Sequence, residues 1–399
     1  PDEEPTPDKA ALYRNVSMAP VFAQKQQQDV VPTSPHRSKQ VMQLADSSQA
    51  AIRARFLLLR EWNEALRPAL PLVDLHLFEN DGHISRQLCI CKGRLLPETK
   101  NHLIERALKL SASSANIPRV SLNISGPDVQ VGFSGSVFGQ MFQQLHGKHS
   151  LTNAKMNEEG EGQLWKVDSM RGEGALAFTD ATDVGGHFRT SLRLLCNDLS
   201  TLSLPIGPRE GQQQPLFIPT PNYVRGAGDG AEAASESYLP NPSFATKNDL
   251  EKFEFVGTLC GAAARFTGFM ELELPSLCWK MLLEQALDLH ELRIVDVSTA
   301  TYLESVLLVE SEGAWRLRQG GEHPVRWRVR LANNQGLALR GDGSALVEFG
   351  EREEYCAAAE KAYLEQFKPQ MAALASGFYQ AFPKVAARLL TWRELQRRV

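Results

Sequence analysis

The amino-acid sequence predicts an α+β fold that is mostly helical, with one small sheet-containing segment inserted between helical regions. The first observation is a helical spacing of apolar residues that stops at Pro68, namely Ile52, Phe56, Leu59, Trp62 and Leu66. The second is the strict alternation of apolar residues with arginine from Val325 to Leu331, which predicts a strand. The third is a long apolar stripe at helical spacing between Tyr363 and Phe382.

Four further helices are predicted between Pro97 and about residue 282. Pro97 is suited to the first turn of a helix, whose predicted buried stripe is Leu103, Ile104, Ala107 and Leu110. The segment from Ser136 to Gln144 has one apolar side made of Val137, Phe138, Met141 and Leu145. Another helix is predicted to begin at Asn248, acting as N-cap in a capping box with Glu251. The chain re-enters a helix after Leu274–Pro275.

The remaining elements are strands and late helices. Val120 to Ile124 alternates as a half-buried strand does. Residues 337–339 and 346–349, joined by the turn Gly341-Asp342-Gly343, are predicted to form a hairpin. Pro369 is expected to kink or restart the long late helix, and a last helical stretch is predicted from about Val385.

Composition excludes several classes of function. The 399-residue chain is 43% hydrophobic with a net charge of −4, so it can bury a core and does not indicate nucleic acid or a membrane as its main partner. No apolar run approaches the roughly 18 residues of a membrane span. Six scattered cysteines favour an intracellular protein. We expect it to be cytoplasmic rather than nuclear. The start at Pro1 suggests part of a longer protein, and residues 1–45 read as a disordered tail.

No group of residues forms a recognisable catalytic or metal-binding constellation. Cys260 and Cys278 sit in apolar helical surroundings and are predicted to be core residues rather than nucleophiles. Cys89 and Cys91 with His83 provide fewer ligands than a usual zinc site. Three other features are weak: the carboxylates Glu173, Asp180 and Asp183 lack a defined geometry, Gly226 to Gly230 lacks the P-loop lysine, and the arginines at 316, 318, 326, 328 and 330 fit a solvated sheet face. No cofactor is expected.

A series of short motifs resembles HECT-type ubiquitin ligases over residues 117–399. In order along the chain these are residues 172–175 (GEGA), 183–189 (DVGGHFR), 216–222 (LFIPTPN), 238–243 (YLPNPS), 253–263 (FEFVGTLCGAA), 272–275 (LELP) with Trp279–Lys280, 288–289 (DL), 377–378 (GF) and 389–395 (LLTWREL). Each motif is short, and it is their order that is specific to the family. Residues 50–115 also resemble the helical lead-in of the large multi-domain members.

The resemblance implies a function for the parent protein. HECT ligases accept ubiquitin from a charged ubiquitin-conjugating enzyme as a thioester on their own cysteine and pass it to a substrate lysine, which divides one transfer into two steps. The family's reactive cysteine lies in a C-terminal lobe, and none of the six cysteines here aligns with it. We therefore expect the chain to be the N-terminal lobe, with the nucleophile after Val399. The implied partners are the conjugating enzyme, ubiquitin and an unknown protein substrate.

The resemblance also implies a docking groove on the small inserted segment. The residues at matching positions are Tyr302, Ser305, Val306, Val309, Val325 and Trp327. Trp327 is expected to face the groove, whereas core packing is an equal possibility for Val306 and Val325. Ser305 departs from the leucine common at its position. The neighbouring arginines are a second departure, and they should either point away from the groove or select an acidic partner.

These patterns divide the chain into parts. We expect a tail over residues 1–45, a helical lead-in over 46–116, a large subdomain made of 117–285 and 351–399, and a docking subdomain over 286–350. Extra residues at 176–182 and 223–237 read as surface loops. A non-catalytic HECT-like scaffold, or a module whose N-lobe surface recruits the substrate, remains the alternative to the docking half of an active ligase.

Overall fold

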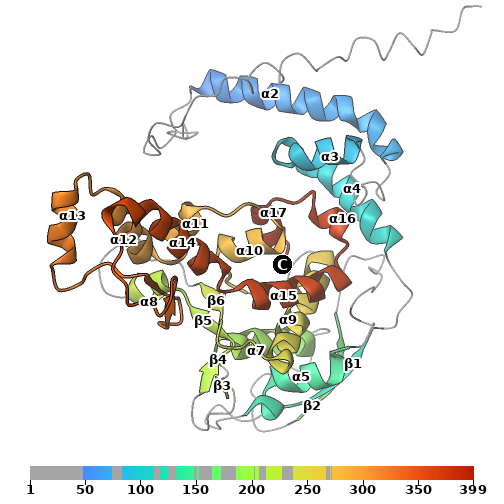
Figure 1. Cartoon of the computed structure of the whole chain (residues 1–399). Coiled ribbons are helices and arrows are strands. Elements are labelled where there is room, and N and C mark those ends of the chain that lie inside the picture. The colour runs from blue at the N-terminus through green and yellow to red at the C-terminus, as the bar shows by residue number, and fades with distance from the viewer. Residues whose placement is uncertain are drawn as a thin grey trace, which may run out of the picture. The chain divides into compact units, whose positions relative to one another are not determined.

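The structure is a computed structural model of the whole chain. It describes residues 48–73, 83–111, 117–124, 132–147, 151, 164–171, 186–201, 203–205, 213–226, 237–266, 270 and 272–399. The motifs at 172–175 and 183–185, the glycine run after Gly226, and the tail over residues 1–45 lie outside these ranges. The described residues are mostly helical with four two-stranded sheets, which confirms the predicted α+β class (Figure 1).

Contacts divide the chain into a short unit that ends at Leu58 and a large unit over residues 59–399. The boundary falls inside the helix α2 (Gln49–Leu66), which runs directly into a 3-10 helix, η2 (Arg67–Leu72), with Pro68 in its first turn. The lead-in continues through α3 (His83–Ile90), η4 (Lys92–Arg94) and α4 (Pro97–Leu110). In α4 the predicted stripe is confirmed at Leu103, Ile104 and Ala107 but not at Leu110, because Leu108 is the buried residue of the last turn.

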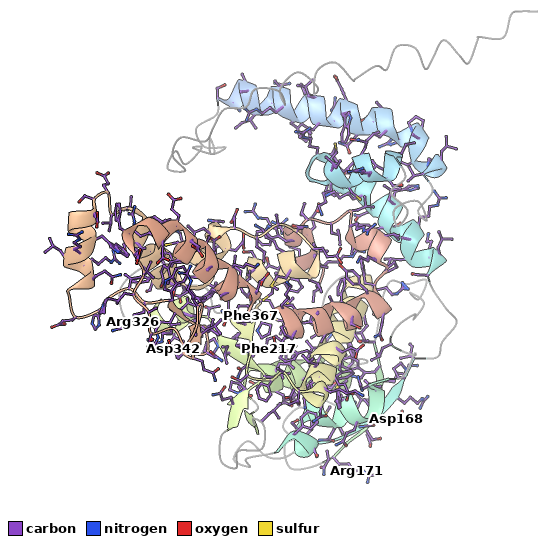
Figure 2. All side chains as sticks on the ribbon, viewed as in Figure 1. Asp168, Arg171, Phe217, Arg326, Asp342 and Phe367 are labelled. Atoms are coloured by element: carbon purple, nitrogen blue, oxygen red, sulfur yellow. The ribbon has the colours of Figure 1, made fainter. Side chains whose placement is uncertain are left out.

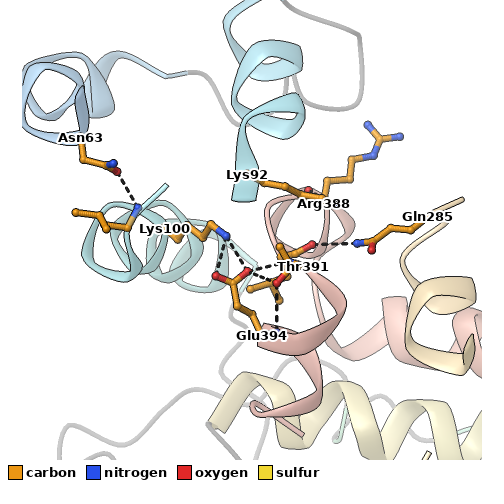
Figure 3. A network of polar contacts seen from close by, with 9 residues as sticks. Asn63, Lys92, Lys100, Gln285, Arg388, Thr391 and Glu394 are labelled. Atoms are coloured by element: carbon orange, nitrogen blue, oxygen red, sulfur yellow. Dashed lines mark hydrogen bonds and ion pairs between the residues drawn. The ribbon is translucent and has the colours of Figure 1, made fainter. Parts of the chain in front are cut away.

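Helix α4 is joined to the C-terminal helices by a network of polar contacts (Figure 3). Lys100 is almost fully buried, and its ammonium group lies 2.7 Å from both carboxylate oxygens of Glu394. Glu394 also accepts hydrogen bonds from the Thr391 backbone N–H and hydroxyl, and so closes the capping box of α17 (Trp392–Gln396). The Lys92 ammonium group donates to the Arg388 carbonyl, next to α16 (Lys384–Ala387). These bonds connect segments almost 300 residues apart.

One parallel sheet lies beside the next pair of helices. Strand β1 (Arg119–Asn123) pairs in parallel with β2 (Lys166–Arg171), and its alternating burial confirms the predicted half-buried strand. The predicted apolar side of α5 (Val137–Leu145) is buried. On the other edge of β1, the Gln140 and Gln144 side chains each exchange two hydrogen bonds with the strand backbone. Helix α7 (Gly186–Thr201) packs against α5, with η5 (Phe133–Gly135) preceding α5.

Two short antiparallel sheets follow. Strand β3 (Ser203–Pro205) pairs with β4 (Gln213–Pro215), and β5 (Phe217–Pro219) pairs with β6 (Tyr238–Pro240). The short helix α8 (Pro221–Gly226) begins directly after β5. The buried amide of Asn241 donates to the Gln214 side chain and to the Pro215 carbonyl, so it ties the turn after β6 to the end of β4.

The core of the large unit is the close pair of helices α9 (Lys247–Phe266) and α15 (Lys368–Ala381), which cross near the centre of Figure 1. Helix α9 begins one residue before the predicted cap: Thr246 and Asp249 exchange side-chain bonds with each other's backbone N–H groups. Asn248 is therefore inside the helix, and the prediction that it caps the helix with Glu251 was wrong. The motif Thr-x-x-Asp offers the same chemistry as the predicted box two residues earlier.

The remaining helices lie within the inserted segment or directly before and after it in the chain. They are α10 (Ser276–Leu282), α11 (Leu289–Val295), α12 (Val297–Leu307), α13 (Glu312–Gln319) and α14 (Arg352–Glu365), the last preceded by η7 (Phe349–Glu351). The predicted long late helix is two helices, because the chain breaks at Gln366–Phe367 and α15 restarts with Pro369 in its first turn. Buried Glu291 contacts Ser276 and Lys280, which ties α11 to α10.

Among the described residues, no helix is both long enough and apolar enough to cross a membrane.

Candidate docking site beside the inserted sheet

The inserted sheet is organised around the segment 325–330. Its regular strands are β7 (Arg328–Arg330) and β8 (Gly336–Ala338), joined by a turn in which Asn334 has a positive φ. Next to these strands, the Val347 N–H donates to the Val325 carbonyl, and the Trp327 N–H donates to the Ala345 carbonyl. The first half of the segment therefore pairs with residues 345–347, and the second half pairs with β8. The predicted hairpin of 337–339 with 346–349 was wrong, because both segments pair with this central strand instead of with each other.

Burial alternates along this central strand as the sequence predicted. Val325, Trp327 and Val329 are buried, while Arg326, Arg328 and Arg330 are exposed. A period of two places the two sets on opposite faces of the strand. In Figure 2, Arg326 and Asp342 mark this part of the molecule, well apart from Asp168 and Arg171 of β2.

Helix α12 forms the other wall of the site. Its N-cap is Asp296, whose carboxylate accepts a hydrogen bond from the Thr299 N–H at 3.1 Å. The helix buries Ala300, Leu303 and Val306. The opposite side, with Tyr302, remains open, since the Tyr302 side chain is 39% exposed. A partner can therefore reach the side of α12 that carries Tyr302, and it cannot reach the buried side.

Between α12 and the central strand lies a cavity of about 910 Å³. Its walls are Ser298, Thr299, Tyr302 and Leu303 of α12, residues 322–324, the exposed arginines Arg326, Arg328 and Arg330 with Val329, the turn residues Asn334 and Gly336, and Tyr355 of α14. A volume of this size lies within the range of small-molecule and peptide-binding sites. The ring of Tyr302 and three guanidinium groups therefore line the same cavity.

The structure separates the residues predicted to form the docking groove. Tyr302 lines the cavity, whereas Val306 and Val325 are fully buried and belong to the core. Ser305 is bonded to the preceding turn of α12 and to α13, because its hydroxyl donates to the Tyr302 carbonyl at 2.6 Å and Arg318 donates to its oxygen atoms. Val309 packs, partly buried, against the core. Of the six predicted residues, Tyr302 is the one that a docked partner can contact directly in this cavity.

The prediction that Trp327 faces the docking groove was wrong. Its side chain is 2% exposed, so it does not face an open groove. The Arg340 guanidinium lies 3.7 Å from the centre of its ring, and Tyr355 packs against it edge to face. Arg340 is itself held by Glu351 and Glu354, each at 2.7 Å. The sequence places Trp327 on the apolar side of an alternating strand, and that side faces the core.

The sequence reasoning missed several residues of the cavity wall. Ser298 and Thr299 lie one turn before Tyr302 on the same helix, so helical periodicity could have found them. Tyr355 comes from α14 and His323 from the segment before the strand, and no local pattern connects them to the groove. The arginines at 326, 328 and 330 were interpreted as a solvated face. They are exposed, and they do line the cavity.

Electrostatics around the cavity come from its arginines and the turn beside them. Hydrogen bonds from the Ser344 hydroxyl and backbone N–H hold the pKa of Asp342 below its usual range, with a smaller contribution from the charge of Arg328. Arg326 donates to the Ser344 carbonyl at 2.5 Å. Both glycines of the turn Gly341-Asp342-Gly343 adopt positive φ angles, which glycine reaches without steric cost.

Three of the cysteines, Cys260, Cys278 and Cys356, are buried. Burial raises the pKa of the Cys260 and Cys278 thiols, and it raises the pKa of Cys356 to about 12. A thiol is nucleophilic as a thiolate, so these three groups are unreactive at neutral pH. They are core residues, as the sequence predicted for Cys260 and Cys278. Within the described ranges, no group of three or more His, Cys, Asp or Glu residues could hold a metal ion.

Comparison with known proteins gives the class of this fold. Residues 212–399 match the HECT domain, which is described as a ubiquitin-transferase domain. The match contains the central helix pair, the inserted sheet and the cavity. It confirms the resemblance drawn from the motifs between residues 216 and 395, while the motifs at 172–175 and 183–189 lie before it.

The chain is also similar to two large ligases. It is 25% identical over 368 residues to the E3 ubiquitin-protein ligase HERC2 of Homo sapiens, and 25% identical over 362 residues to HERC2 of Mus musculus. Each alignment covers 87% of this chain, so it extends into the region before residue 212. The chain spans about 7% of the length of these curated relatives.

Proposed function

We propose that this chain is the N-terminal lobe of a HECT ubiquitin ligase and that the cavity beside the inserted sheet docks a ubiquitin-conjugating enzyme charged with ubiquitin. Ubiquitin then passes to a cysteine of the ligase as a thioester, and from it to a lysine of a protein substrate. The observation that carries the proposal is the cavity between α12 and the central strand, with the exposed ring of Tyr302 in its wall. Exposed aromatic rings are frequent anchors of protein interfaces.

In this proposal each part of the chain has its own role. Residues 286–350 act as the docking subdomain, residues 117–285 with 351–399 as the large subdomain, and residues 46–116 as a helical lead-in. In favour of this assignment, α14 packs against both α12 and the central strand. The Tyr355 hydroxyl of α14 donates to the Arg328 carbonyl at 3.1 Å. The lead-in contacts the C-terminal helices through Lys100 and Glu394.

The accepting cysteine is proposed to lie outside these 399 residues. Cys260, Cys278 and Cys356 are buried, and their raised pKa values keep them as thiols. None of the six cysteines stands in a motif like that of the family's reactive cysteine. The role proposed for this chain is therefore to hold the charged enzyme while the transfer takes place elsewhere in the ligase.

The first test is an NMR or calorimetric titration of the chain with a panel of ubiquitin-conjugating enzymes. We expect binding with a dissociation constant of about 1 μM or weaker, roughly −8 kcal/mol. Tyr302→Ala should weaken it about tenfold or more, because the ring lines the cavity without belonging to the core. Phe56→Ala is the matched control, since Phe56 is an exposed aromatic residue of α2 that does not line the cavity.

The alternatives predict different outcomes. If the folded chain binds no conjugating enzyme, the docking proposal is refuted, and a non-catalytic scaffold or a substrate-recruiting module becomes the better reading. If enzymes bind equally to the wild-type chain and to Tyr302→Ala, docking occurs at another surface. Trp327→Ala is not a suitable probe, because the loss of a buried ring changes stability as well as binding.

A further inference from the structure

We propose, on the basis of the proposed docking function, that the cavity selects conjugating enzymes whose docking loop carries carboxylate side chains next to an apolar or aromatic residue. Three features of the molecule define the chemistry of this partner. They are the three exposed arginines of the central strand, the residues opposite them in the sheet, and the neighbouring aromatic ring.

The three arginines lie on one face and line the same cavity. Arg326, Arg328 and Arg330 are exposed, and a period of two directs them to the same side of the strand. Glu322 is the one carboxylate among the described residues of the cavity wall, and His323 adds an imidazole. The wall is therefore positively charged at neutral pH, although the chain as a whole carries a net charge of −4.

The sheet does not neutralise these arginines from within. Arg326 faces Leu346, Arg328 faces Ala338, and Arg330 faces Gly336 across the strand pairs. An opposite charge at these positions is the usual way to stabilise a cross-strand arginine. Here the three positions opposite hold two apolar residues and a glycine, so none of the three arginines has a charged neighbour across the strand pairs. Arg326 donates one hydrogen bond to the Ser344 carbonyl, while Arg328 and Arg330 are left available to a partner.

Three other arginines in this part of the chain have carboxylate partners. Arg293 pairs with Glu304, Arg316 with Glu312, and Arg340 with both Glu351 and Glu354. In the described part of the chain, no carboxylate lies within ion-pair distance of the three arginines on the cavity wall, and Asp342 near Arg328 is bonded to Ser344. Unpaired charge is thus concentrated at the cavity.

The ligand chemistry follows from these groups. A guanidinium binds a carboxylate through two parallel hydrogen bonds, which gives arginine an advantage over lysine at such sites. The exposed face of Tyr302, with Arg318 5.5 Å from its ring centre, suits an apolar or aromatic side chain. An acidic loop with one such residue satisfies both features, while a basic loop is repelled by the strand.

The experiment uses the full chain and two kinds of probe. The first is a pair of synthetic peptides with a central phenylalanine flanked by glutamates or by lysines. The second is the panel of conjugating enzymes, ranked by the charge of their docking loops. We expect the glutamate peptide and the acidic-loop enzymes to bind more tightly, with an affinity that falls as salt rises from about 50 to 500 mM because salt screens exposed charges.

Charge reversal at the cavity supplies the decisive variant. Arg328→Glu combined with Arg330→Glu should weaken the acidic probes by roughly tenfold or more and strengthen the lysine peptide. Arg316→Glu is the matched control, because Arg316 is an exposed arginine of α13 outside the cavity, and it should leave both affinities within about twofold. Circular dichroism of each variant checks that the fold is retained, and Arg330→Gln provides a milder second variant.

The outcomes separate this inference from the proposed function. Enzymes that bind through Tyr302 without any preference for acidic loops would overturn the inference and leave the docking function in place. Binding of the glutamate peptide, dependent on Arg330, without binding of any conjugating enzyme would overturn the choice of partner and the docking function together. Preference for basic loops would overturn the charge argument directly.

Discussion

Substitution of Gly377 by alanine should separate the two helices at the centre of the fold. An ideal Cβ atom at Gly377 would lie 1.8 Å from the Glu254 carbonyl oxygen and 2.8 Å from the Thr258 nitrogen, both on the backbone of α9. In the reverse direction, a Cβ atom at Gly257 would lie 1.9 Å from the Leu374 carbonyl oxygen of α15. The two glycines thus allow α9 and α15 to approach until their backbones are in contact.

The size of the effect follows from this clash. A carbon and a carbonyl oxygen ordinarily approach to about 3.3–3.6 Å, so the helices must move apart locally by about 1.5 Å or more. Overpacking of a core costs about 1–3 kcal/mol and occasionally more, and here the obstacle is backbone rather than a flexible side chain. Alanine regains about 1 kcal/mol of helix propensity over glycine. With a cost at the upper end of this range or above it, about 3 kcal/mol or more, the net loss in the free energy of unfolding should be about 2 kcal/mol or more.

The assay is urea unfolding followed by circular dichroism, comparing the midpoint and slope for wild type and variant. Gly313→Ala is the matched control, because Gly313 lies in the helix α13 with nothing within 4 Å of an added Cβ atom. It should leave stability unchanged or raise it by up to about 1 kcal/mol. If Gly377→Ala unfolded at the same urea concentration as wild type, the close backbone contact of α9 with α15 would be refuted.

Four further predictions concern the Lys100–Glu394 pair, the contact of Arg340 with Trp327, and the buried cysteines. Lys100→Met should lower stability, because it leaves the Glu394 carboxylate without its partner at the base of α17, and the double variant with Glu394→Gln should recover part of the loss in thermal unfolding. Burial alone would raise the pKa of Glu394, but hydrogen bonds from Lys100 and Thr391 outweigh it and hold the pKa below its usual 4.5. Stability from this group is therefore present above about pH 4.5 and lost as the pH falls through the lower folded value, and a stability profile between pH 3 and 7 should become flatter in Glu394→Gln. Arg340→Ala should expose Trp327 to water, which a red shift of its fluorescence would reveal; an unchanged spectrum would show that the guanidinium does not cover the ring. In the native protein Cys260 and Cys278 should resist a thiol reagent until urea unfolds the chain, since fast labelling without denaturant would contradict their burial.

Local periodicity was sufficient to predict most of the helices. The stripe of Leu103, Ile104 and Ala107 and the apolar side of α5 are buried as expected, because amphipathic spacing directly records which face meets the core. The break at Gln366–Phe367 was foreseen from Pro369, because its ring cannot continue an interior turn of a helix. The family resemblance drawn from ordered motifs was confirmed over residues 212–399.

Strand pairing and the orientation of the site could not be read from local pattern. The segments 337–339 and 346–349 each look like half of a hairpin, yet both bond to residues 325–330, and sequence alternation does not encode which strand is the neighbour. Trp327 has the residue type of an interface anchor, but the Arg340 guanidinium lies over its ring and is held there by Glu351 and Glu354. Tyr355 and His323 come to the cavity from separate elements, so tertiary folding alone brings them together.

The tie between Lys100 and Glu394 has a consequence for the synthesis of this chain. The two residues are 294 positions apart. At a translation rate of about 5–20 residues per second, roughly 15–60 s pass between the emergence of the lysine and that of its glutamate. During this interval α4 has its apolar stripe and a lysine that will be buried, without the C-terminal helices that complete their surroundings. The lead-in therefore has to remain without these partners for this whole interval while the rest of the chain is made.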